Sequence, residues 1–140
     1  LVFMNEKLNS LKPIAISGGE PIPDGYPAWL EDLDTGTKYL IPYGSWTLGR
    51  QSEESEVDIP IRTSADNMLY ISKKQGIVTL KRNLIGENAL YLRDCKNVAN
   101  PSNVEGFETN RFFNYQILHE DLVQIGATFF RAYLNQPGEE

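Results

Sequence analysis

The chain has 140 residues, which is the length of one domain at about 100–200 residues per domain. Apolar residues make up 41% and charged residues 23%, so the composition excludes a wholly disordered or collagen-like chain. The net charge of −6 and the absence of a run of roughly 18 apolar residues argue against nucleic-acid and membrane partners, because the first needs basic groups and the second an apolar span.

Residues 1–27 are rich in proline, glycine and serine, which indicates an irregular, extended linker or arm outside the core. Residues 135–140 are typical of an exit tail, and the domain itself is expected over residues 28–134. Because Leu1 is not a natural start, we expect the chain to be part of a larger multidomain protein.

Between these ends, short apolar stretches alternate with turn residues. The turn-like segment 34–37 separates two such stretches and predicts a β-hairpin. Pro60, within the alternating segment 57–61, suits an edge strand or a bulge. Further strands are predicted at 76–81, 89–93, 122–125 and 128–134. No segment shows a helical stripe, so the sequence predicts an antiparallel β-sandwich or small barrel, with Trp29, Trp46, Phe129 and Phe130 in its core.

Candidates for catalysis are few. With one cysteine (Cys95) and one histidine (His119), the chain lacks zinc sites built from several of them and has no internal disulfide. We interpret Cys95 as a small buried side chain and His119 as a loop residue, and no spacing singles out a pair of carboxylates. We therefore expect no metal, no cofactor and no enzyme activity. The missing targeting signals make the cytoplasm the expected location, and an unpaired cysteine is compatible with a reducing compartment.

Four short motifs occur in a fixed order between the predicted strands. They are Gly49-Arg50, Ser72-Lys73-Lys74-Gln75, Leu92-Arg93-Asp94 with the polar loop 95–106 after it, and the segment 118–126 before the last strand. This order resembles the forkhead-associated (FHA) domain, which carries Gly-Arg, Ser-x-x-His, an Asn-Gly loop and Gly-Asp-x-Ile-x-Ile-Gly. The resemblance covers about residues 28–134.

The resemblance implies a β-sandwich whose loops at one end bind phosphothreonine peptides, as a non-catalytic protein-interaction module in signalling. Arg50 matches the family's phosphate-binding arginine, Ser72 its phosphate-binding serine and Lys73 the basic residue that often follows. The chemistry is suitable, because a guanidinium can meet two oxygens of a phosphate that carries about −1.5 to −2 charges.

The chain departs from the family at two positions that shape the loops. Gln75 stands where the family has a structural histidine. In the third loop, Pro101 replaces a glycine if Asn100 matches the family's peptide-binding asparagine, a register that also places Ser102 among the binding residues. In a second register Asn97 is that asparagine.

Three functional interpretations stay open. Arg50 and Ser72 favour a phosphopeptide-binding module, whereas Gln75 and Pro101 favour a degenerate FHA fold that binds unphosphorylated protein partners. The acidic stretch 51–56 beside Arg50 would weaken phosphate binding, or would favour basic residues in the ligand if its carboxylates point outward. The third interpretation is an unrelated enzyme or carbohydrate-binding sandwich.

Overall fold

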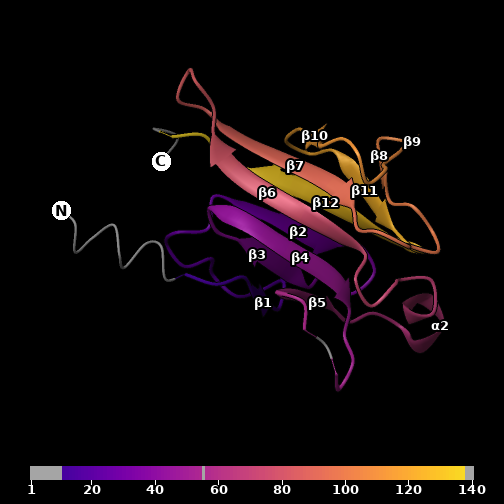
Figure 1. Ribbon diagram of the computed structural model, residues 1–140. Helices are drawn as coiled ribbons and strands as arrows, with labels where there is room; N and C mark the ends of the chain where they lie inside the picture. The colour runs from indigo at the N-terminus through magenta and orange to yellow at the C-terminus, as the bar shows by residue number, and fades with distance from the viewer. Residues whose placement is uncertain (1–10, 55, 138–140) are drawn as a thin grey trace.

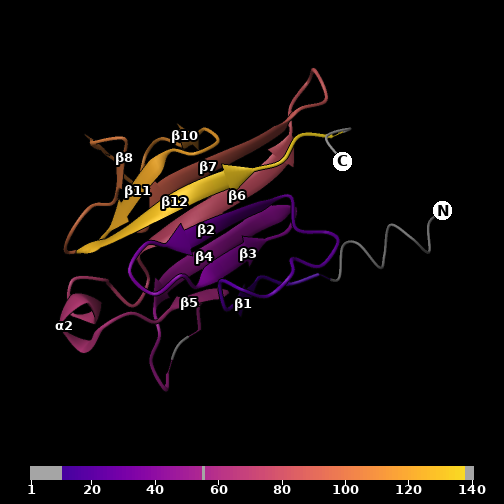
Figure 2. The same cartoon turned by 180° about the vertical axis from the view of Figure 1, so that it is seen from behind.

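A computed structural model describes residues 11–54 and 56–137, which form two facing β-sheets (Figures 1 and 2). The predicted β-sandwich is confirmed. The seven-stranded sheet has the order β1-β3-β2-β12-β11-β8-β9, and the five-stranded sheet the order β10-β7-β6-β4-β5. The strands are β1 (Ile14–Ile16), β2 (Ala28–Asp32), β3 (Lys38–Ile41), β4 (Gly44–Arg50), β5 (Ile59–Ile61), β6 (Gly76–Arg82), β7 (Asn88–Asp94), β8 (Asn103–Val104), β9 (Phe107–Glu108), β10 (Tyr115–Ile117), β11 (Leu122–Ile125) and β12 (Thr128–Leu134).

Period-two alternation places the core between the sheets. In β12, every second residue from Thr128 to Leu134 is buried, while the residues between them are partly or largely exposed. Phe130 is fully buried, and burying a side chain of this kind stabilises the fold by about 1.5–3 kcal/mol. The other aromatic residues expected in the core are less buried. Trp29 and Trp46 are half-buried, and Phe129 lies on the outer face with 42% exposure.

The predicted hairpin at 34–37 is present. Strands β2 and β3 pair antiparallel, and the backbone N–H of Gly36 donates to the Asp32 carbonyl at 2.8 Å. Gly36 has φ +78°, a left-handed conformation that glycine adopts without strain. The Asp32 carboxylate also accepts from the backbone N–H of Asp34 at 2.8 Å, which fixes the turn.

Pro60 lies in β5, which is an edge strand as predicted. The pairing of β5 with β4 is parallel, so the five-stranded sheet is mixed rather than purely antiparallel. An edge position suits proline, because the residue has no N–H to donate to a neighbouring strand.

Two local predictions are corrected. Part of the expected irregular arm forms strand β1, which pairs with β3, and Tyr26 is buried with its hydroxyl donating to the Lys12 carbonyl at 2.7 Å. A one-turn helix, α2 (Ala65–Met68), follows the N-cap Ser64, whose side chain accepts from the Asn67 N–H. A single turn is too short to show a hydrophobic stripe. Residues 1–10 of the arm and 138–140 of the tail lie outside the described residues. Within the described part of the chain, no helix is long and apolar enough to cross a membrane.

Candidate functional site

Three segments meet at one end of the sandwich: residues 50–54, which begin with the last residue of β4, residues 69–75 before β6, and residues 95–102 after β7. We call them the loop cluster. The backbone N–H of Arg50 donates to the Ser72 carbonyl at 3.0 Å, and the N–H of Ala99 donates to the Ser72 hydroxyl at 3.2 Å. Ser72 therefore contacts both of the other segments, which brings Arg50 and the third loop to the same place.

Gly49 allows the closest approach within the loop cluster. A Cβ atom at this position would lie 2.0 Å from the Lys73 carbonyl oxygen and 3.1 Å from the Ser72 carbonyl oxygen. No side chain fits there. Gly49, the first residue of the Gly-Arg motif, thus has a structural role. It lets the segment that carries Ser72 lie directly against β4.

Gln75 joins the second and third segments from inside. Its side chain is fully buried. Its Oε1 accepts from the Ser72 N–H at 2.9 Å, while its Nε2 donates to the Asn100 carbonyl at 2.8 Å and to the Ser102 hydroxyl at 3.2 Å. A primary amide carries an acceptor and two donors on one group, so a glutamine can brace both segments at once.

Ser102, which the motif resemblance places among the binding residues, lies inside the domain in the structure. Its side chain is fully buried and its hydroxyl accepts from Gln75. Its carbonyl accepts from the Thr109 hydroxyl at 3.0 Å, and the same hydroxyl donates to the buried Asp94 carboxylate at 2.6 Å. Ser102 therefore belongs to an internal network that holds the third loop, and Asp94 and Thr109 are members that sequence reasoning missed.

The two candidate asparagines occupy different positions in the third loop. Asn100 is exposed, and its Nδ2 donates to the Tyr70 carbonyl at 3.2 Å, which connects the loop to the second segment. Asn97 is exposed with φ +67°, a left-handed conformation in which asparagine is enriched. Asn100 is thus fixed beside Ser72, and Asn97 marks a turn of the loop.

The loop cluster presents cationic and hydroxyl donors to solvent. Arg50 is half-buried, and within residues 11–54 and 56–137 its guanidinium has no hydrogen bond or ion pair. The Ser72 hydroxyl accepts from Ala99, and its own O–H stays available as a donor. Lys73 is exposed, and its Nζ lies 4.0 Å from a Glu54 carboxylate oxygen, a distance and exposure typical of a weak pair. This set of donors can bind an anion.

Cys95 and His119 do not form a catalytic pair. The backbone N–H of Cys95 donates to the Gln75 carbonyl at the loop cluster. Burial raises the pKa of the Cys95 thiol, although the positive charges of Lys74 and Arg93 act to lower it. His119 Nδ1 accepts from the Leu134 N–H, at the far end of β12. Within the described residues, no three His, Cys, Asp or Glu side chains are grouped as a metal site.

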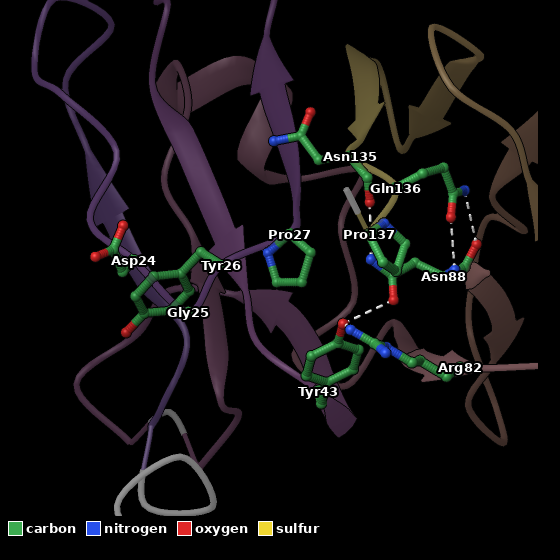
Figure 3. Close-up of a pocket in the computed structure, with 10 residues that line it drawn as sticks. All are labelled: Asp24, Gly25, Tyr26, Pro27, Tyr43, Arg82, Asn88, Asn135, Gln136 and Pro137. Atoms are coloured by element: carbon green, nitrogen blue, oxygen red, sulfur yellow. Dashed lines mark hydrogen bonds between the residues drawn. The ribbon is translucent and has the colours of Figure 1, made fainter. Parts of the chain in front are cut away.

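A cavity of about 400 Å³ lies at the opposite end of the sandwich, where β12 ends (Figure 3). Here the Tyr43 hydroxyl donates to Asn88 at 2.7 Å, and Asn88 donates to the Asn135 carbonyl at 2.8 Å. Gln136 pairs with the backbone of Asn88 in both directions. These bonds attach residues 135–136, directly after β12, to the start of β7, so we assign this end of the sandwich a structural role.

No protein-family model matches the chain, and no curated protein is similar to it in sequence. Solved structures do match. An FHA domain studied for its phosphothreonine-dependent interactions has a TM-score of 0.59 at 16% identity, over 77% of this chain and 96% of that one. The chain has the FHA fold. An FHA domain from Chlamydia trachomatis matches with a TM-score of 0.59 at 17% identity, over 76% and 95% of the two chains. The MEK1 FHA domain in complex with a HOP1 phosphothreonine peptide matches with 0.55 at 19%, over 79% and 98%.

The loop cluster, which carries the motifs that resemble the FHA family, therefore lies on an FHA fold. The order of the motifs and the backbone geometry both correspond to the FHA fold. In sequence, the signals for the internal network were the Leu-x-Asp motif ending at Asp94 and the position of Gln75.

Proposed function

We propose that the loop cluster binds phosphothreonine-containing segments of protein partners and that the domain is a non-catalytic interaction module. The observation that carries the proposal is the Arg50 guanidinium, unpaired among the described residues and next to the Ser72 segment. A half-buried arginine without a partner is suited to a dianionic ligand, because the pair forms charge-assisted, bidentate hydrogen bonds. Support also comes from the MEK1 FHA domain, which shares the fold and was solved with a phosphothreonine peptide.

In this proposal the roles are divided among the sequence-predicted residues. Arg50 contacts the phosphate, the Ser72 hydroxyl donates to it, and Lys73 adds positive charge at the rim. Asn100 or Asn97 contacts the peptide backbone, with Asn100 favoured because it is fixed beside the Ser72 segment. Protein kinases supply ligands of this class, so we place the domain in signalling. We also propose that it acts in the cytoplasm as part of a larger protein.

One observation favours a second candidate function. Glu54 lies 4.0 Å from Lys73, and Glu53 is also exposed beside Arg50, so carboxylates compete with a phosphate for the same cations. If this competition dominates, the domain binds unphosphorylated partners through another surface of the same fold.

Isothermal titration calorimetry with a degenerate peptide library centred on phosphothreonine separates the two candidates. The unphosphorylated library is the ligand control, and Arg111→Ala is the variant control, because Arg111 is exposed in the loop between β9 and β10. We expect binding of the phosphorylated library alone, loss of this binding in Arg50→Ala, and no change in Arg111→Ala. Equal binding of both libraries by the wild type would refute the proposal.

A further inference from the structure

The hairpin between β6 and β7 carries two aliphatic side chains at its tip, where polar residues are usual. Leu84 is 107% exposed and Ile85 is 77% exposed. The hairpin extends beyond the rest of the sandwich (Figure 1). We call residues 83–87 the aliphatic tip.

The aliphatic tip has a fixed shape. The Gly86 N–H donates to the Asn83 carbonyl at 3.0 Å, and the Asn83 N–H donates to the Glu87 carbonyl at 2.8 Å. The Asn83 side chain accepts from the N–H groups of Ile85 and Glu87 at 3.1 and 3.0 Å. A turn held by this many bonds presents Leu84 and Ile85 with little ordering cost on binding, which favours a contact surface.

A groove of about 600 Å³ lies on the flank of the sandwich where β9 and β10 are the edge strands of their sheets. Its apolar lining comes from Val104, Phe107, Tyr115 and Leu118, and Phe107 and Leu118 are 72% and 56% exposed. Glu105 and Asp121 add two carboxylates to this lining. We call this site the flank groove.

The aliphatic tip and the flank groove are both apolar, and the charges beside them are opposite in sign. Lys81 and Arg82 are exposed where β6 enters the tip, and Glu87 is the carboxylate within the hairpin turn. Lys81 Nζ lies 5.4 Å from the centre of the Tyr91 ring, and Arg82 Nε donates to the Tyr43 hydroxyl at 3.4 Å, so both cations keep their charge at the base of the tip. The groove carries the two acidic residues. Their positions are fixed, because Glu105 accepts from the Leu122 N–H at 2.7 Å and Asp121 from the Leu118 N–H at 2.8 Å.

The tip and the groove are also neighbours on the surface. A cavity of about 270 Å³ is lined by Asn83 and Glu87 from the tip and by Gln116 and Leu118, which line the groove as well. Adjacent complementary sites on one chain allow two copies to exchange tips about a two-fold axis, an arrangement that closes as a dimer.

We propose that the domain self-associates, with the aliphatic tip of each copy inserted into the flank groove of the other. The occupant is a second copy because each chain carries both halves of the contact with opposite charges. The tip is small, and contacts that bury less than about 1,200 Å² belong to weak, transient complexes. The contact lies away from Arg50, so it is independent of phosphopeptide binding.

Sedimentation velocity between about 10 µM and 1 mM, a range that covers weak affinities, tests the proposal. The wild type is expected to form a dimer as its concentration rises. The double variant Leu84→Ser/Ile85→Ser and the groove variant Leu118→Asp are each expected to weaken dimerisation at least tenfold, with unchanged melting curves. Leu69→Ser is the matched control, since Leu69 is 75% exposed outside both sites, and it is expected to dimerise like the wild type.

Mixing the two variants makes the test specific. The tip variant keeps its groove and the groove variant keeps its tip, so their mixture regains one of the two contacts and is expected to dimerise more than either variant alone. A wild type that stays monomeric to about 1 mM, where even weak pairs associate, overturns the proposal and leaves the groove to a different partner. Wild-type-like dimers in both variants, or a mixture no heavier than its components, overturn it as well.

Discussion

The Gln75 side chain donates to the Asn100 carbonyl at 2.8 Å, a bond that connects residues 25 positions apart in sequence. The same amide accepts from the Ser72 N–H, so one buried group sets the distance between the segments that carry the proposed phosphate and peptide contacts. A glutamine does not titrate, so this brace is expected to keep its geometry over the whole physiological pH range.

Replacing Gln75 with glutamate tests the brace. An ionised carboxylate cannot donate to Asn100, and leaving a buried group unsatisfied costs about 1–3 kcal/mol. Burial raises the pKa of such a glutamate in the folded state, so the folded variant binds its proton more tightly than the unfolded chain. The variant is therefore expected to lose further stability as the pH rises above about 4.3, the usual pKa of glutamate.

Urea unfolding of Gln75→Glu and wild type at several pH values measures this effect. Gln75→His is the control, because a neutral imidazole keeps one donor and one acceptor. A Gln75→Glu variant as stable as the wild type at neutral pH would show that the amide is not a brace.

Gly49→Ala is expected to destabilise the domain. The new Cβ atom would lie 2.0 Å from the Lys73 carbonyl oxygen, and the backbone must move to admit it. Overpacking of this kind costs about 1–3 kcal/mol, which a thermal melt detects. Gly19→Ala is the matched control, because nothing lies within 4 Å of a Cβ at that position. Equal melting temperatures for the two variants would contradict the close approach of β4 to the Ser72 segment.

Changes at Arg50 and Ser72 separate charge from geometry. Arg50→Lys keeps the charge but loses the planar fork, so weaker phosphopeptide binding is expected. Ser72→Ala is expected to cost about 0.5–1.5 kcal/mol of binding free energy, or up to about 3 kcal/mol because the phosphate is charged. Calorimetry measures both, and melting curves should stay near that of the wild type. An Arg50→Lys variant that binds like the wild type would exclude a bidentate contact.

Glu54→Gln is expected to tighten phosphopeptide binding, because it removes a carboxylate 4.0 Å from the Lys73 ammonium. Both groups are exposed, so the gain is modest, about two- to fivefold, and it shrinks as salt screens the charges. Glu108→Gln on β9 serves as the control for net charge. An unchanged affinity in Glu54→Gln would show that this carboxylate does not compete with the ligand.

Cys95 should react slowly with alkylating reagents at neutral pH. Burial raises the pKa of its thiol, and the thiolate is the reactive form. The folded state holds the proton more tightly than the unfolded chain, so folding stability is expected to fall as the pH rises past about 8.5, the pKa of a free cysteine. Iodoacetamide labelling of native and urea-unfolded protein measures the difference. Faster labelling of the native protein would instead indicate an activated nucleophile.

The core strands were predicted well from the sequence. A strand with one face toward the core alternates apolar and polar residues, and this alternation is visible in the sequence. Segments 76–81, 122–125 and 128–134 each became a strand. The edge strand β1 was missed because its residues are mostly exposed, so no alternation of burial marks it. The one-turn helix α2 was missed because four residues give no helical period.

The candidate site was less predictable, because it depends on contacts between distant segments. The motif order identified Arg50 and Ser72, whose segments meet in the structure. It could not show that the Ser102 hydroxyl points inward, since burial of a small polar residue follows from the Gln75 and Asp94 contacts and not from local pattern.

The most direct test of phosphothreonine binding is a ¹⁵N-resolved NMR titration of the domain with the phosphothreonine peptide library. We expect the backbone amide signals of Arg50, Ser72 and Ala99 to shift with the phosphorylated library and to stay in place with the unphosphorylated one. Amides of β9 and β10, on the flank groove, should not move with either library. Shifts confined to another surface, or identical shifts with both libraries, would contradict phosphothreonine binding at the loop cluster.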